Sequence, residues 1–143
     1  MGPSTQRSAP PPRAETSTRS PDDALTLLAI FQREGRFVDF LKQDVDAFPD
    51  ADIGAAARVV HAGCRRALSM HFDIVRVRDE AEGTAVTVLA NETTAINLTG
   101  DVRGSPPYRG VLRHAGWRVE KTNLPAVVPG HDVTVVCQAE VEL

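Results

Sequence analysis

Cysteine is scarce in this chain: Cys64 and Cys137 are the only two among 143 residues. A small domain held together by disulfides would use more, so we interpret both as reduced thiols. Long apolar runs are missing too. No stretch approaches the roughly 18 residues of a membrane span, and no secretory apolar core follows Met1. We therefore expect a cytoplasmic protein that does not associate with membranes through this chain.

Lysine is also scarce, because 2 of the 16 basic residues are lysines and the other 14 are arginines. The formal net charge is −3, and acidic and basic residues are mixed along the chain. A general nucleic-acid-binding protein normally carries a basic excess. The charge balance therefore argues against nucleic acid as a partner.

Aliphatic residues other than alanine are absent from residues 2–20, where Pro, Ser, Thr and Arg dominate. Such a segment cannot bury enough apolar surface to offset the entropy lost on ordering. We predict a disordered tail or linker over residues 1–20 and a single domain over residues 21–143.

Helical periodicity dominates residues 21–72. Apolar residues recur at helical spacing on both sides of Gly35, and a second helix is predicted from about Asp50 to His71. Gly35 interrupts the first pattern, which indicates a kink, a break or a close packing contact. All five phenylalanines lie in this half of the chain, so we expect the helices to supply most of the aromatic core.

From Asp73 onward the apolar period changes to two, which predicts a sheet over about residues 73–143. Five or six strands fit the pattern, with segments 95–102 and 132–143 among them. The sequence thus predicts an α+β fold. Two N-terminal helices, or three segments if the chain breaks at Gly35, would pack on one face of a C-terminal antiparallel sheet. The last strand alternates apolar residues with polar ones, namely Val133, Val135, Cys137, Ala139, Val141 and Leu143 with Thr134, Gln138, Glu140 and Glu142.

His61, Cys64 and His71 share one side of the second predicted helix, at spacings of three and seven. This arrangement suggests a metal site or a nucleophile–base pair. No CxxC or HxxxH pair supports a metal site, and Cys64 belongs to the apolar stripe, where cysteine is usually a small buried residue. We expect no metal, no cofactor and no catalytic residue, and keep a small ligand-binding domain, metal site or enzyme as the alternative.

The stretch from Ser105 to Arg118 holds the only tyrosine and the only tryptophan. We interpret it as a hairpin that turns at residues 115–116, with its aromatic residues on the buried face. The other face would then carry Arg109, Arg113 and Arg118, with the last two directly opposed. Either neighbouring acids or an anionic partner neutralises these arginines. The sharper hypothesis is a docking surface for an acidic protein segment.

Several blocks resemble a bacterial family known as domain of unknown function 2760 (DUF2760): "LLAIFQREGRFVDFLKQDVDAF", "DADIGAAARVVHAGCRRAL", "LRHAGWRVEKTNLP" and the terminal "AEVEL". The resemblance covers the chain from about Asp23 to Leu143. It implies no activity and no catalytic residue. It does imply an accessory or interaction role, linked to seventy-kilodalton heat-shock-type chaperones. The resemblance also implies an apolar or amphipathic N-terminal segment before a Pro/Ala-rich linker, whereas we interpret the residues before Pro21 as linker-like sequence alone.

We therefore expect a non-enzymatic protein-interaction or accessory module with an unknown protein partner. The arginine-bearing hairpin, the arginine face of the second helix and an exposed sheet edge are the candidate surfaces. A homodimer formed through the C-terminal strand is a further hypothesis, because its alternation reaches Leu143.

Overall fold

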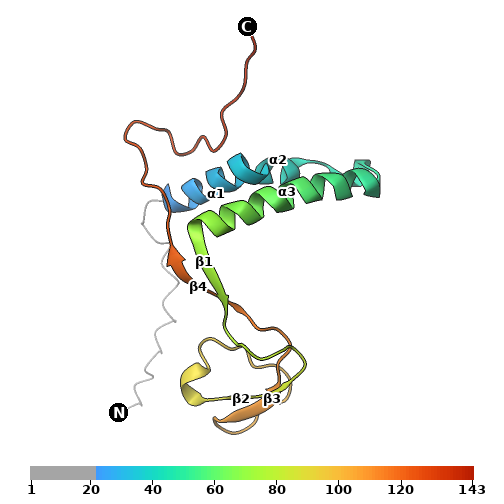
Figure 1. Ribbon diagram of the computed structural model, residues 1–143, viewed down its shortest axis with the longest axis vertical. Helices are drawn as coiled ribbons and strands as arrows, with labels where there is room; N and C mark the ends of the chain where they lie inside the picture. The colour runs from blue at the N-terminus through green and yellow to red at the C-terminus, as the bar shows by residue number, and fades with distance from the viewer. Residues whose placement is uncertain (1–21) are drawn as a thin grey trace, which may run out of the picture.

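The computed structural model describes residues 22–143, in which helices come first and antiparallel strands follow (Figure 1). The tail predicted over residues 1–20 lies outside the described residues. The α+β class is confirmed. The elements are α1 (Asp22–Gly35), α2 (Phe37–Lys42), the 3-10 turn η1 (Val45–Ala47), α3 (Asp50–His71), β1 (Phe72–Arg76), β2 (Ala85–Val88), the 3-10 turn η2 (Ala90–Glu92), β3 (Tyr108–Val111) and β4 (Trp117–Thr122).

Helices α1 and α3 lie side by side and run in opposite directions (Figure 1). Two glycines let them approach closely. A Cβ atom on Gly63 would lie 2.5 Å from the Cα atom of Gly35, and one on Gly35 would lie 2.5 Å from the Sγ atom of Cys64. Such distances leave no room for a side chain on either glycine. Ile30 and Ala67 are the other buried apolar residues of this helical pair.

The helical backbone breaks at Arg36, which adopts the left-handed conformation with a φ of 53°. Gln32 bridges the break, although the residue is only 5% exposed. Its Oε1 atom accepts hydrogen bonds from the backbone N–H groups of Val38 and Asp39, at 2.9 and 3.2 Å. The first N–H groups of a helix have no partner within that helix. Gln32 therefore caps α2, and Gly35 marks both a break and a close contact.

The strands form two two-stranded sheets that continue one another as a single antiparallel ribbon. In one sheet β1 pairs with β4, and in the other β2 pairs with β3. The end pairs of the two ladders are Phe72 with Thr122, Arg76 with Trp117, Ala85 with Val111, and Val88 with Tyr108.

Backbone hydrogen bonds carry the pairing from one sheet into the other. Residues 77–78 donate to the carbonyl oxygens of residues 115–116, at 3.3 and 3.0 Å. Leu112 bonds residues 83–84, at 2.7 and 2.9 Å. Between these bonds the strand that leaves β1 has four residues, 79–82, whereas the returning strand has two, 113–114. The ribbon therefore bends there.

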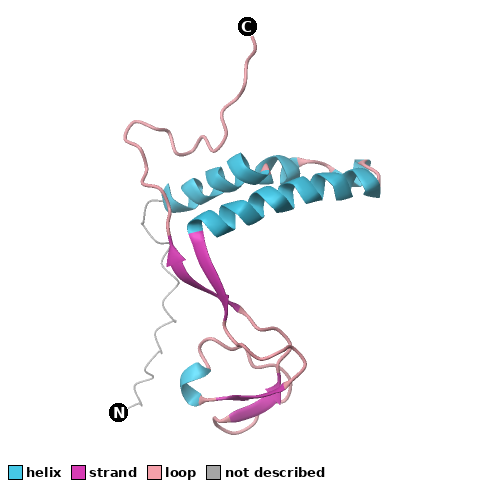
Figure 2. Ribbon diagram, viewed as in Figure 1, coloured by secondary structure: helices cyan, strands magenta, loops and turns pink. Residues whose placement is uncertain are grey.

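The β1–β4 strands of the ribbon adjoin the end of α3 (Figure 2). His71 and Asn123 join the two through hydrogen bonds. The backbone N–H of Asn123 donates to the carbonyl oxygen of His71 at 2.7 Å. The Nδ1 atom of His71 lies 2.7 Å from the carbonyl oxygen of Asn123. Because a carbonyl oxygen can only accept, Nδ1 carries the hydrogen. The two bonds hold the strands at the point where β1 leaves the helix and the chain continues beyond β4.

The prediction of five or six strands is wrong: residues 22–143 contain four. Segments 95–102 and 132–143 pair with no strand in the described part of the chain. The helices also do not cover a face of a sheet, because α1 and α3 lie across one end of the ribbon (Figure 1). A two-stranded ribbon is too narrow to offer a broad face to two helices.

The predicted burial of the two rare aromatic residues is only partly right. Tyr108 is half-buried, whereas Trp117 is 68% exposed. Trp117 pairs with Arg76 at the end of the β1–β4 ladder. The buried residues of the ribbon lie elsewhere, at Val88, Leu112 and Ala115.

Candidate functional site

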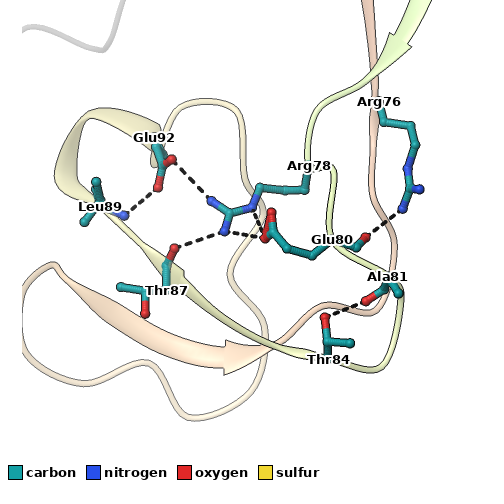
Figure 3. A network of polar contacts seen from close by, with 8 residues as sticks. All are labelled: Arg76, Arg78, Glu80, Ala81, Thr84, Thr87, Leu89 and Glu92. Carbon is teal, nitrogen blue, oxygen red and sulfur yellow. Dashed lines mark hydrogen bonds and ion pairs between the residues drawn. The ribbon is translucent and has the colours of Figure 1, made fainter.

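Arg78 fixes the part of the ribbon that carries β2 and β3 (Figure 3). Its side chain is 16% exposed and donates to the Oε2 atom of Glu80 at 2.6 and 3.0 Å. It also donates to Oε1 of Glu92 and to the carbonyl oxygen of Thr87, both at 3.2 Å. Glu92 in turn accepts the backbone N–H of Leu89 at 2.7 Å. One arginine therefore joins the bend, β2 and η2.

The charges of this network reinforce each other. The hydrogen bond from Arg78 holds the pKa of the Glu80 carboxyl below its ordinary value. The same bond raises the pKa of Arg78. A hydrogen bond between charged groups is stronger than one between neutral groups. The Arg78 contacts therefore help to hold β2 and η2 against the bend of the ribbon.

One edge of β3 has no strand beside it in the described part of the chain. Leu112 directs its N–H and carbonyl groups toward residues 83–84, on the β2 side. In an antiparallel pair, alternate residues face alternate sides, so Gly110 and Tyr108 also bond toward β2. The backbone groups of Arg109 and Val111 therefore point to the open edge, where another strand can pair with them.

A groove of about 640 Å³ follows this region of β3. One wall consists of consecutive residues, Pro107 to His114. The other wall comes from residues 96–99 and 101–103 of the loop before β3. Val88 completes the lining. The groove thus combines an unpaired strand with an irregular loop, and both apolar and charged side chains face it.

Among the described residues, the charged groups of the groove that lack an ion-pair partner are arginines. Arg103, which also lines it, is paired with Asp101 at 2.9 Å. Within residues 22–143, Arg109 and Arg113 have no acidic group within 4.0 Å, and both are exposed. Two unpaired guanidinium groups beside an open strand edge favour a negatively charged ligand.

The three arginines singled out from the sequence do not form one surface in the predicted way. Arg109 lies on β3 and Arg113 lies just beyond it, and both line the groove. Arg118 lies on β4 opposite Val75, so the predicted Arg113–Arg118 opposition is wrong. The predicted hairpin at residues 115–116 is wrong for the same reason. These residues pair with residues 77–78 and form no two-residue turn.

The alternative site on α3 is not assembled. His61 is exposed, and the backbone of Asn123 occupies Nδ1 of His71. Across residues 22–143 the structure contains no group of three or more His, Cys, Asp or Glu residues placed to hold a metal ion. Burial raises the pKa of the Cys64 thiol. A raised pKa disfavours the thiolate that a nucleophile needs.

Sequence reasoning missed the second wall of the groove, because it assigned residues 95–102 to a strand. The signal that was available is the pair Gly100 and Gly104, both of which have positive φ, at 84° and 75°. Two glycines that flank three residues indicate a loop more strongly than a strand. Arg103, between them, is one of the groove residues that the sequence did not suggest.

A second hollow, of about 450 Å³, lies where α2 and η1 meet α3. Three charged residues line it, of which Arg36 and Asp39 pair with each other at 3.2 Å and Asp52 is the third. The lining is otherwise mainly apolar, with Phe40, Phe48 and Ile53 among its members. It therefore offers fewer features than the groove from which to infer a ligand.

The structure defines a small α+β module in which a helical hairpin carries a β-ribbon with an open, arginine-bearing edge. Residues 20–142 match Domain of unknown function (DUF2760), and the chain belongs to that family. No curated protein and no solved structure matches the chain. In the part from Asp22 to Leu143, no helix has both the length and the apolar character needed to cross a bilayer.

Proposed function

We propose that this protein is a non-enzymatic interaction module that binds extended, acidic protein segments along the open edge of β3. Binding by strand addition uses the backbone of the ligand for affinity and alternate side-chain positions for specificity. Arg109 and Arg113 would select for negative charge. The arginine-based docking surface suggested by the sequence is thereby narrowed to two of its three residues.

The observation that carries this proposal is that the groove lies along the unpaired edge of β3. The groove wall from Pro107 to His114 includes β3 itself, so a bound segment would lie within reach of unpaired backbone groups. Arg109 and Val111 offer these groups on the side away from β2. The Arg78 network supports the proposal because it fixes the sheet before a ligand arrives.

A seventy-kilodalton heat-shock-type chaperone as partner is a narrower form of the same proposal. Its support is the family resemblance alone. The groove itself indicates only the chemistry of the ligand, an extended acidic segment, and that segment could belong to any protein. To test the narrower form, purified chaperone of this type is added to the protein with a bound acidic peptide. Displacement of the peptide by the chaperone is the expected result.

Fluorescence anisotropy with a labelled peptide of alternating valine and glutamate tests the proposal on the full chain. Arg109→Ser and Arg113→Ser should each weaken binding by about tenfold, because each removes a charge-assisted hydrogen bond. Added salt should weaken binding to the wild type more than to these variants. Arg58→Ser and Arg65→Ser are matched controls, since both arginines are exposed on α3. Equal affinity of all four variants for the peptide would refute the proposal.

A proline scan of the peptide tests strand addition separately from charge. Proline removes the backbone donor that an added strand uses, so alternate positions should lose affinity and the others should not. Loss at every position, or at none, would argue against strand pairing.

A further inference from the structure

The C-terminal segment from Val133 to Leu143 has the sequence of a strand but lacks a partner strand in the described chain. Three of its apolar side chains lie open to solvent: Val135 is 42% exposed, Val141 is 80% exposed and Leu143 is fully exposed. Beyond Val135, no hydrogen bond between two backbone groups involves this segment among residues 22–143. An alternating segment with unpaired backbone is suited to pairing with a sheet edge.

The segment also has the charge that the β3 edge calls for. Glu140 and Glu142 lie two residues apart, and therefore on one face of an extended chain. The groove supplies Arg109 and Arg113, which have no ion-pair partner in the described part of the chain. The two surfaces are thus complementary in charge and in backbone geometry.

An antiparallel register matches both faces of the two strands. If Glu142 stands opposite Arg109, then Glu140 stands opposite Val111 and diagonal to Arg113. The opposite faces then meet as apolar pairs, with Leu143 beside Tyr108, Val141 beside Gly110 and Ala139 beside Leu112. Tyr108 is half-buried and Leu112 is buried, so the apolar side of the tail meets the apolar side of β3.

The position of the segment points to a second molecule as the source of this strand. The tail leaves the ribbon where Asn123 bonds His71, beside the helices. Figure 1 shows the C-terminus and the β2–β3 sheet at opposite ends of the molecule. Exchange between two copies lets each tail reach the groove of the other, and a two-fold arrangement satisfies both at once.

We propose that residues Gln138–Leu143 of one copy add as an antiparallel strand to β3 of a second copy, with Glu142 paired to Arg109. This inference rests on the proposed function of the groove, and it names the first ligand of that groove. The dimer closes the groove, so an acidic partner would have to displace the tail.

Charge exchange tests the pairing, with molar mass measured by light scattering over a concentration series. The wild type should pass from monomer to dimer as its concentration rises. Glu142→Arg and Arg109→Glu should each shift that transition to at least about tenfold higher concentration, because like charges then face each other. The variant with both exchanges should dimerise again.

Mixing the two single variants separates exchange between molecules from folding back within one molecule. In a mixed dimer both strand pairs carry opposite charges, so the mixture should dimerise at concentrations where neither variant does alone. Glu120→Arg and Arg118→Glu repeat the charge changes on β4 and should leave the wild-type transition unchanged.

A wild type that stays monomeric at every concentration would overturn this inference, as would single variants that dimerise like the wild type. So would a mixture that stays monomeric. The peptide experiment is repeated with Glu142→Arg, whose groove is vacant. If this variant binds the peptide in an arginine-dependent way while the wild type is monomeric, the groove proposal is supported and the dimer proposal is refuted. Absence of peptide binding to the vacant groove makes the groove proposal fail.

Discussion

Gly63 of α3 lies directly against Gly35 at the end of α1, and a Cβ atom on Gly63 would lie 2.5 Å from the Cα atom of Gly35. This contact sets how closely the two helices approach. Gly63→Ala should therefore lower the free energy of unfolding by about 3 kcal/mol, because main chain must move to admit the methyl group. Urea denaturation measures the change.

Gly54→Ala is the matched control for that variant, since Gly54 lies on the same helix and a Cβ atom there meets nothing within 4 Å. Alanine is the better helix former by about 1 kcal/mol, so this variant should gain stability. If both glycine variants gained stability, the close contact between α1 and α3 would not exist in solution.

Gln32→Leu should lower the free energy of unfolding by about 1–3 kcal/mol. The change leaves the backbone N–H groups of Val38 and Asp39 without the acceptor that now satisfies them. Gln43→Leu, at an exposed position, should change stability by less than about 0.5 kcal/mol. Thermal unfolding of the two variants side by side distinguishes a cap from a surface glutamine.

Acid should weaken the fold in part through Glu80. Its pKa in the folded protein is lowered from an ordinary 4.5, chiefly by the hydrogen bond from Arg78. The stabilisation is therefore present above pH 4.5 and is lost as the pH falls through the lower folded value. The Arg78→Gln variant removes the cause of the lowered pKa. Between about pH 5 and pH 3, the urea midpoint of this variant should fall less steeply than that of the wild type.

The single tryptophan gives a direct test of the ribbon. Because Trp117 is 68% exposed, acrylamide should quench its fluorescence nearly as well in the native protein as in urea. Trp117→Ala should then change the melting temperature little, since it leaves no cavity. Strong protection from acrylamide would instead support the buried hairpin face that the sequence suggested.

The two thiols should react at different rates with a thiol reagent. Cys137 is exposed, whereas burial raises the pKa of Cys64 and lowers its thiolate fraction. We expect one fast and one slow phase, and Cys137→Ser should remove the fast one. A fast phase that persists in that variant would restore Cys64 as a candidate nucleophile.

Local chemistry explains which predictions held. The break at Gly35 and the switch from helix to strand near Asp73 both follow from residue spacing, and both are found. Predictions about pairing failed where they relied on a local turn. Residues 115–116 look like the centre of a hairpin, and Gly116 does have a positive φ of 74°. However, their carbonyl groups bond residues 77–78, which lie far away in the sequence.

For the candidate groove, too, the sequence predicts local features and does not predict which distant segments meet. The arginines are visible in the sequence, but the loop that faces them and the open edge beside them are not. An alternating pattern shows that a segment suits a strand, and it does not name the neighbouring strand. Residues 132–143 carry such a pattern and have no partner within the described chain.

The sequence by itself determined the α+β class, the helix boundaries near Asp50 and His71, and the break after α1. These features depend on residues a few positions apart. Only the tertiary structure decided that Gln32 caps α2, that Trp117 stays exposed and that Arg109 and Arg113 share a groove without Arg118. Each of those outcomes depends on which distant segments bond to one another, and the backbone groups that make such bonds are the same in every residue except proline.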